Sequence, residues 1–184
     1  MIIWINGAFG SGKTALVTEL HHRFPQTLVF DPESVGELLR SIVSPSSGDF
    51  QDLPLWRTEV AAIAAGLVTE YGRPVLVPMT LLAPVYVTEI FDLIAEAGVP
   101  VEHFYLQVSP ETLVRRIDER IENPDNPEAE EASRSWCKQQ IQPCMERARL
   151  LPESTVLLDG EKQTRVLADE VVARIGSLSF REEQ

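Results

Sequence analysis

Residues 7–14 read Gly-Ala-Phe-Gly-Ser-Gly-Lys-Thr, which is the pattern G-x-x-x-x-G-K-T. The segment follows an apolar run at 2–5 and leads into a helical pattern that begins near residue 13. A strand, loop and helix in this order direct several backbone N–H groups and the positive end of the helix dipole at one point. Glycines keep side chains out of the way of an anion there. The pattern therefore predicts a phosphate-binding loop made of Gly7, Ala8, Phe9, Gly10, Ser11, Gly12, Lys13 and Thr14.

Two side chains of this loop are suited to nucleotide chemistry. Lys13 can reach the β- and γ-phosphates of a bound nucleotide, and the Thr14 hydroxyl can ligate Mg²⁺. We therefore expect ATP and Mg²⁺ as the cofactors, with Lys13 stabilising the phosphoryl group in transfer.

Length and charge limit the kinds of partner. The chain has 184 residues, so we expect one domain spanning 1–184. Its 28 acidic and 16 basic side chains give a net charge of −12. A groove that follows a nucleic-acid backbone needs a basic surface, so nucleic acid is not the expected partner. A single nucleotide is compatible with this charge, because one local loop can overcome a distant negative field.

The sequence also predicts a cytoplasmic protein. An apolar strand begins at residue 2 without a charged leader segment, and the longest obvious apolar run, 60–68, is too short to span a bilayer. Cys137 and Cys144 lie seven residues apart with no histidine or further cysteine nearby, so they do not form a metal site. Two reduced thiols are typical of a cytoplasmic protein.

Apolar runs alternate with helical patterns along the chain. Strands that alternate with helices predict an α/β fold, in which helices cover both faces of a parallel sheet. We expect five strands, at 2–6, 27–31, 74–79, 101–107 and 154–158, and helices at 13–23, 32–42, 54–70, 84–96, 109–122, 133–149 and 164–176.

One segment differs from the rest in composition. Residues 122–131 are polar and acidic and contain two prolines, so the segment cannot bury a face and is expected to be exposed and mobile. It interrupts two helical patterns, as a lid does, and we place the lid at about 121–135. An idle surface loop is the alternative.

Asp31 follows the second expected strand. Ligands of open α/β sheets bind beyond the carboxyl ends of the strands, so Asp31 should lie near the phosphate-binding loop. It could accept a proton from a substrate hydroxyl or hold Mg²⁺ through water. The alternative is a helix cap, because Pro32 and Glu33 follow it.

Arg116 and Arg120 lie four residues apart just before the expected lid. Like charges at this spacing are slightly unfavourable on a helix, and a bound triphosphate would neutralise them. We expect Arg116 to contact the nucleotide and Arg120 to stabilise the transition state. Two solvated arginines are the alternative.

Further sequence features bear on the substrate. The third expected strand lacks the terminal aspartate of motor and transporter ATPases, and no N-K-x-D motif for guanine occurs, which favours a small-molecule kinase.

Thr80, at the end of that strand, is a candidate substrate contact, although it could simply finish the strand. Trp56 and Arg57 begin a long helix on the side where substrate should lie, and packing is the alternative role for Trp56.

Residues 1–14 resemble the opening of the bacterial tunicamycin resistance proteins. The likeness continues at 30–33 and 52–57, and more loosely at 113–120. It implies an ATP-binding protein that protects the cell from tunicamycin, a fatty-acylated uracil nucleoside antibiotic. The implied fold is similar to chloramphenicol phosphotransferase, shikimate kinase and nucleoside kinases: three layers, with a five-stranded parallel sheet in the order 2-3-1-4-5.

The same resemblance implies roles for particular residues. Loop 7–14 would bind the phosphates, Asp31 would be the base, Arg57 a substrate contact, and Arg116 and Arg120 the lid arginines.

The resemblance also raises the question of membrane binding, because some members of that family associate with membranes through a C-terminal amphipathic helix. The tail 164–184 is short, and its polar side carries Asp169 and Glu170 in place of a basic stripe, which argues against membrane binding. A peripheral membrane location is the alternative to the cytoplasm, and a homodimer is left open.

The expected function is ATP- and Mg²⁺-dependent phosphotransfer to a hydroxyl of tunicamycin or a similar nucleoside-like compound. Two alternatives remain: a protein that binds and sequesters tunicamycin without catalysis, and a small-metabolite kinase.

Overall fold

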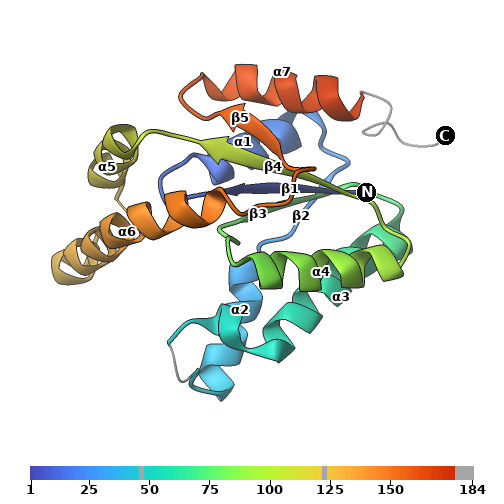
Figure 1. Cartoon of the computed structure of the whole chain (residues 1–184), viewed down its shortest axis with the longest axis horizontal. Coiled ribbons are helices and arrows are strands. Elements are labelled where there is room, and N and C mark those ends of the chain that lie inside the picture. Colours follow the sequence, from blue (N-terminus) through green and yellow to red (C-terminus); the bar gives the residue numbers. More distant parts are fainter. Residues whose placement is uncertain (46–47, 122–123, 177–184) are drawn as a thin grey trace.

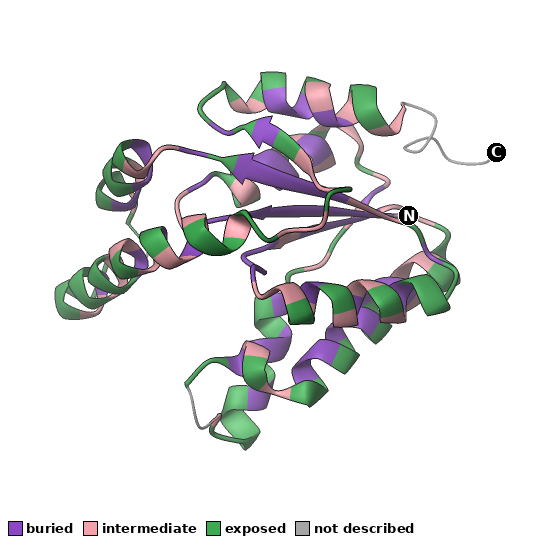
Figure 2. Ribbon diagram, in the orientation of Figure 1, coloured by how far each residue is buried: buried purple, intermediate pink, exposed green. Residues whose placement is uncertain are grey.

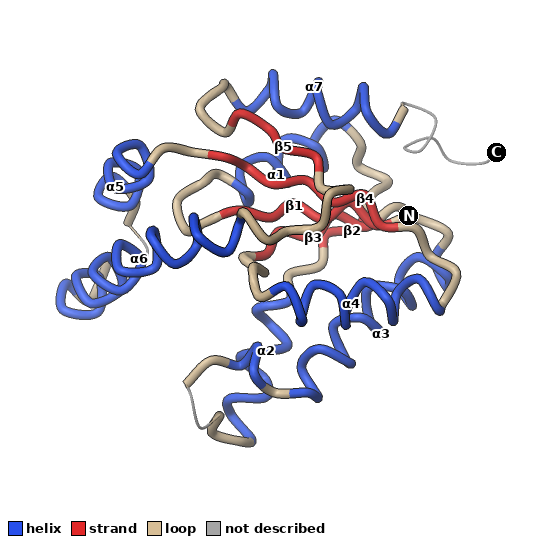
Figure 3. The backbone as a smooth tube through the Cα atoms, viewed as in Figure 1, coloured by secondary structure: helices blue, strands red, loops and turns tan. Residues whose placement is uncertain are grey.

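A computed structural model describes residues 1–45, 48–121 and 124–176. Its five strands form one parallel sheet in the order β2-β3-β1-β4-β5, which confirms the predicted fold class and strand order (Figures 1 and 3). The strands are β1 Ile2–Gly7, β2 Leu28–Val29, β3 Val75–Met79, β4 Val101–Gln107 and β5 Val156–Asp159. The helices are α1 Lys13–Arg23, α2 Pro32–Ile42, the 3-10 helix η1 Phe50–Asp52, α3 Pro54–Tyr71, α4 Pro84–Glu96, α5 Pro110–Glu119, α6 Pro127–Ala148 and α7 Thr164–Ile175.

Helices cover both faces of the sheet, with α1 and α7 on one side and α3 and α4 on the other (Figure 1). Successive side chains of a strand point to opposite faces, so β1 supplies both cores. Ile3 and Ile5 pack in the core beneath α1 and α7, whereas Ile2 and Trp4 pack in the core beneath α3 and α4. The central strand β1 is consequently buried along its length (Figure 2).

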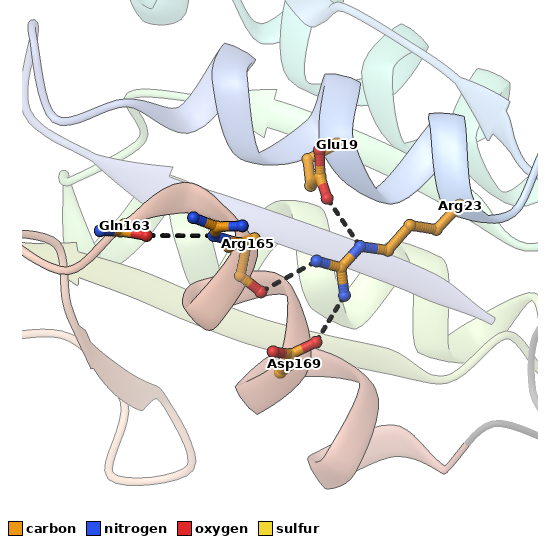
Figure 4. Close-up of polar contacts among 5 residues, drawn as sticks. All are labelled: Glu19, Arg23, Gln163, Arg165 and Asp169. Atoms are coloured by element: carbon orange, nitrogen blue, oxygen red, sulfur yellow. Dashed lines mark hydrogen bonds and ion pairs between the residues drawn. The ribbon is translucent and has the colours of Figure 1, made fainter.

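The side chain of Arg23 links α1 to α7 (Figure 4). Its guanidinium forms ion pairs with Glu19 of its own helix at 2.7 Å and with Asp169 of α7 at 2.5 Å. It also donates to the carbonyl of Arg165 at 3.0 Å. Two of these contacts, to Asp169 and to the Arg165 carbonyl, join the two helices on this face.

Several helices begin with the same local device, a capping side chain followed by proline. Asp31 caps α2, Ser109 caps α5 and Asn126 caps α6, each accepting a hydrogen bond from a backbone N–H of the first turn. Proline is favoured at the next position because its fixed φ suits a helix and its missing N–H is not needed there.

The structure corrects the predicted start of the helix that follows the lid segment. A helix was expected only from residue 133, but α6 begins at Pro127, so residues 127–135 are helical. One side chain of the segment is buried: Glu130 is 8% exposed. It forms an ion pair with Arg134 at 3.0 Å. The reason is the cap at Asn126, whose side chain accepts from the Ala129 N–H at 3.0 Å. Residues 122–123 of the expected lid lie outside the described residues, and lid motion stays a prediction.

A buried polar network lies between β1 and β4. Nδ2 of Asn6 lies 3.2 Å from Nε2 of His103, and Nδ1 of His103 lies 3.0 Å from the Thr155 hydroxyl. Since the Asn6 amide nitrogen can only donate, Nε2 of His103 accepts and Nδ1 carries the proton. Desolvation lowers the pKa of His103 to about 4, so the ring is neutral in the folded protein at neutral pH.

This neutral histidine predicts acid sensitivity. In the unfolded chain its pKa is about 6.5, so between pH 6.5 and 4 the unfolded state binds a proton that the folded state does not. The free energy of unfolding should therefore fall as the pH falls through this range, by up to about 3 kcal/mol from this residue. Urea unfolding at several pH values measures it, with His103→Gln as the matched variant. Parallel pH profiles of the two proteins would contradict the prediction.

Within the described residues, none of the helices has the length and hydropathy needed to cross a bilayer.

Candidate functional site

The loop between β1 and α1 is shaped to hold an anion. Gly12 is the N-cap residue of α1, with φ 98° and no side-chain cap, and the first turn of the helix contains no acidic residue. The first N–H groups of a helix have no partners within it, so they are available to a ligand here. Gly10 has φ 80°, and a Cβ at this position would lie 3.1 Å from Cγ1 of Ile117. The strained φ and close packing require glycine at this turn.

Two polar side chains of the loop are poised for a ligand. Among the described residues, the buried hydroxyl of Ser11 has no hydrogen-bond partner. Nζ of Lys13 donates to the carbonyls of Gly7 and Ala8 at 3.1 and 2.9 Å, so the ammonium lies across the loop. Desolvation lowers the pKa of Lys13 to about 8. Such a half-buried, partly desolvated cation gains from a nearby phosphate.

Proton uptake on nucleotide binding is expected from this pKa. At pH 8 about half of the Lys13 side chains are neutral, and a polyphosphate beside them would raise the pKa again. Binding of Mg²⁺–ATP at pH 8 should therefore take up about 0.5 proton per protein, and Lys13 should add almost none at pH 6.5. Calorimetry in buffers of different ionisation enthalpy measures this number. Lys13→Arg, which stays charged, should abolish the uptake, and equal uptake by both proteins would contradict the assignment.

A cavity of about 590 Å³ gathers the predicted catalytic residues and most of the predicted nucleotide-binding residues, whereas Gly7, Ala8 and Ser11 do not line it. Asp31 lies in its wall and is exposed, and its carboxylate accepts from the Glu33 N–H at 2.9 Å. Asp31 thus caps α2 and also lies beside the phosphate-binding loop. The residues predicted from the sequence that line this cavity are Phe9, Gly10, Gly12, Lys13, Thr14, Asp31, Arg116 and Arg120.

The two arginines reach the cavity from the end of α5. Arg116 donates to the carbonyl of Ser11 at 3.2 Å and to that of Gly160 at 3.0 Å, so it bridges the loop to the turn after β5. Arg120 is the C-cap residue of α5 and contacts Sγ of Cys137 at 2.9 Å. Both guanidiniums therefore lie where they can meet a polyphosphate.

A clamp around Gly7 positions the loop, and sequence analysis did not find its main residue, Asn6. Oδ1 of Asn6 accepts from the N–H groups of Gly7 and Leu81 at 2.8 and 3.0 Å, and Nδ2 donates to the Leu81 carbonyl at 2.5 Å. The buried Thr80 hydroxyl donates to the Gly7 carbonyl at 2.9 Å. A polar residue that ends an apolar strand was the available signal.

Two residues proposed as substrate contacts lie elsewhere. Trp56 is 0% exposed, and its indole N–H donates to the Pro32 carbonyl at 3.0 Å, so the packing alternative describes it. Arg57 forms an ion pair with Glu89 at 2.5 Å and its guanidinium lies 4.3 Å from the Tyr86 ring centroid. Neither lines the cavities described here. They face inward because α3 presents them to α2 and α4, which sequence position alone does not reveal.

A second cavity, of about 540 Å³, adjoins the first. The two share Phe9, Glu33 and Trp136 in their walls. Trp136 of α6 is 51% exposed, and its ring centroid lies 4.8 Å from that of Phe9. Thr80 lines this second cavity. Of these residues the sequence analysis missed Trp136, although a tryptophan in a polar helical segment was a signal.

The donor set also fits magnesium as nucleotide enzymes use it. Among the described residues there is no group of three histidine, cysteine or acidic side chains that could hold a metal alone. Mg²⁺ commonly binds through few protein ligands together with substrate phosphates and water. Thr14, at the exposed start of α1 in the first cavity, is placed to supply such a ligand.

Comparison with known proteins agrees with this geometry. The solved structure of the Deinococcus radiodurans tunicamycin resistance protein matches with a TM-score of 0.73 and 26% identity over 95% of each chain. A Sinorhizobium meliloti gluconokinase matches with a TM-score of 0.61 and 17% identity, over 96% of this chain and 92% of the other. The Mycobacterium tuberculosis APS kinase in complex with AMPPNP and APS matches with 0.63 and 17%, over 95% and 96%. No curated protein sequence matches the chain.

The two kinases share the fold with this chain, and the tunicamycin resistance protein is similar in sequence as well. The sequence profile that matches is that of the AAA domain, and it covers residues 2–144. That range contains the phosphate-binding loop, Asp31 and both arginines of the first cavity. With a phosphate-binding loop at the carboxyl edge of a five-stranded parallel sheet, and a profile that matches most of its length, the chain belongs to the AAA domain family.

Proposed function

We propose that the protein is an ATP- and Mg²⁺-dependent phosphotransferase that acts on a hydroxyl of tunicamycin or a similar nucleoside-like compound. One observation carries this proposal more than any other. The cavity that holds Lys13 and Asp31 opens beside a second cavity of similar volume, and the two share three wall residues. A kinase needs such an arrangement, because donor phosphate and acceptor hydroxyl must meet in line.

The likenesses to known proteins support the choice of reaction and substrate. Gluconokinase and APS kinase, two of the proteins with this fold, carry kinase names. The tunicamycin resistance protein is more similar in sequence than either and is named for the antibiotic. These names describe those proteins, and they motivate the same reaction class and ligand for this chain.

The loop and its lysine would hold the donor. Bound Mg²⁺–ATP supplies the phosphoryl group, and the metal offsets part of its charge. The N–H groups at the start of α1 would bind the phosphates, and Thr14 would ligate the metal. Lys13 would leave the Gly7 and Ala8 carbonyls and stabilise the charge on the transferred group. Arg116 and Arg120 would stabilise the same charge from the other side of the cavity.

Asp31 would orient the acceptor hydroxyl and accept its proton. A new bond then forms between the acceptor oxygen and the γ-phosphorus while the bond between that phosphorus and the bridging oxygen breaks, which releases ADP. Asp31 is exposed and already accepts one hydrogen bond from the Glu33 N–H through Oδ1. A carboxylate offers several lone-pair sites, so the cap leaves capacity for the hydroxyl.

Incubation of tunicamycin with ATP, Mg²⁺ and the protein tests the proposal. Mass spectrometry should show the gain of one phosphate by the antibiotic. Asp31→Asn keeps an oxygen that can cap α2 but is a poor base, so it should slow transfer by about a hundredfold while antibiotic binding is retained. Absence of any phosphorylated product at every protein concentration would reject phosphotransfer.

Asp31 is exposed and caps α2, and this role is also compatible with the second candidate function, non-catalytic sequestration of tunicamycin. Protection of cells would then be stoichiometric with protein and equal for the wild type and Asp31→Asn. A small-metabolite kinase would be recognised by a better acceptor in a substrate panel and by unchanged growth on the antibiotic.

A further inference from the structure

Gln51 lies in the wall of the second cavity and is linked to the phosphate-binding loop. It belongs to η1 and is half-buried. Its Nε2 donates to the carbonyl of Thr80 at 3.0 Å. The Thr80 hydroxyl in turn donates to the Gly7 carbonyl at 2.9 Å, and Nζ of Lys13 donates to the same carbonyl at 3.1 Å. Three hydrogen bonds therefore join Gln51 to the lysine of the loop.

Arg57 holds the backbone of Gln51. The buried guanidinium of Arg57 donates through Nη1 to the Gln51 carbonyl at 2.7 Å, and its Nε pairs with Glu89 of α4 at 2.5 Å. Its guanidinium carbon lies 4.3 Å from the ring centroid of Tyr86. A planar cation that is bonded and stacked in this way has few other positions to adopt. The arginine expected to contact the substrate is thus bonded to a residue of the cavity wall.

Other contacts hold η1 without leading to the loop. The Asp49 carboxylate caps η1 by accepting from the Gln51 N–H at 2.9 Å. The Tyr86 hydroxyl donates to the carboxylate of Asp52 at 2.6 Å. Neither Tyr86 nor Asp52 is among the described residues that line the two cavities. The Tyr86 contact therefore offers a comparison for Gln51 within the same short helix.

We propose that Gln51 is a positioning residue for the phosphate-binding loop, which it reaches through Thr80, and that Arg57 keeps Gln51 in place. The loop packs closely at Gly7, because a Cβ there would lie 2.5 Å from Oγ of Ser11. A shift of Gly7 is therefore transmitted to the loop. A loop that is ordered before the ligand arrives loses less entropy on binding. The consequence for phosphoryl transfer rests on the proposed function, whereas the consequence for nucleotide binding does not.

Calorimetric titration with Mg²⁺ and AMPPNP, a non-hydrolysable analogue of ATP, tests the proposal. Gln51→Met keeps the length of the side chain and removes its donor. It should weaken binding about fivefold, which corresponds to one hydrogen bond of about 1 kcal/mol. Gln51→Glu lacks the donor and sets a carboxylate against the Thr80 carbonyl, so it should weaken binding at least as much. Arg57→Lys keeps a cation for Glu89 without the planar fork, so it should also weaken binding.

Tyr86→Phe is the matched control. It removes the hydrogen bond to Asp52 of η1 and keeps the ring that contacts Arg57, so the affinity for AMPPNP should stay unchanged. A general loosening of η1 would instead lower the affinity in both variants. In a Thr80→Val background the route to the loop is already broken, so Gln51→Met should cost less than about a further twofold. Thermal unfolding verifies that each variant is folded.

Unchanged affinity in Gln51→Met would overturn the inference, as would an equal loss in Tyr86→Phe or a full further loss in the Thr80→Val background. Unchanged affinity in Arg57→Lys would overturn the role given to Arg57. Failure of the proposed function looks different. If the affinities follow the expected pattern but no phosphate is transferred to any acceptor, the positioning role stands and phosphotransfer does not. Transfer by Gln51→Met at the wild-type rate and affinity would reject the positioning role and leave phosphotransfer intact.

Discussion

Replacement of Lys13 by alanine should lower the rate of phosphoryl transfer about a thousandfold. The lysine is the cation that crosses the loop, and two loop carbonyls accept from its ammonium where a bound phosphate would replace them. Removing it leaves the charge on the transferred group without its main partner in a partly desolvated site. Mass spectrometric assay of tunicamycin phosphorylation at saturating ATP measures the loss of rate, and calorimetry measures the loss of nucleotide affinity.

The fold should tolerate this change. Desolvation already lowers the pKa of Lys13, so the folded protein pays an energetic penalty for keeping the group charged, and alanine removes it. The melting temperature of Lys13→Ala should therefore be at or above that of the wild type without nucleotide. Lys13→Arg keeps the charge and tests geometry. Wild-type ATP affinity in Lys13→Ala would contradict the role assigned to the loop.

Replacement of Asn6 by alanine should destabilise the protein by about 3 to 5 kcal/mol. Its amide satisfies the N–H of Gly7, the N–H and carbonyl of Leu81, and faces Nε2 of His103. All of these groups are buried, and each group left without a partner costs about 1–3 kcal/mol. Chemical denaturation followed by circular dichroism measures the free energy of unfolding.

Thr80→Val provides a graded comparison. It is close in shape and removes a single hydrogen bond, from the Thr80 hydroxyl to the Gly7 carbonyl at 2.9 Å, so a loss of about 1 kcal/mol is expected. Nucleotide affinity should fall in both variants, because Gly7 begins the loop. If Asn6→Ala lost no more stability than Thr80→Val, the network would be less important than its geometry implies.

Local sequence patterns predicted most of the fold correctly. The five strands and the helices α1, α2 and α4 appear where expected, since strand alternation and capping residues act over a few neighbouring positions. The start of α6 was predicted wrongly, although the sequence contains the signal for it. Asn126, Pro127 and Glu128 repeat the capping pattern of Asp31, Pro32 and Glu33, yet the acidic composition favoured a loop.

The candidate site likewise has one part that the sequence predicts and one part that it does not. The phosphate-binding loop is one continuous segment, so its residues and spacing are sufficient to predict it, and the parallel sheet brings Asp31 to its edge. The second cavity draws Arg40 from α2 and Arg147 from α6, and no pattern links residues so far apart in the chain.

The sequence by itself determined the loop, the alternation of strands and helices, and the residues that can meet a phosphate, because these depend on neighbouring residues and on backbone geometry. Only the tertiary structure decided that Trp56 and Arg57 face inward, that Asn6 and His103 share a network, and that Trp136 stands between two cavities. Burial depends on what packs against a residue, and those partners lie far away along the chain.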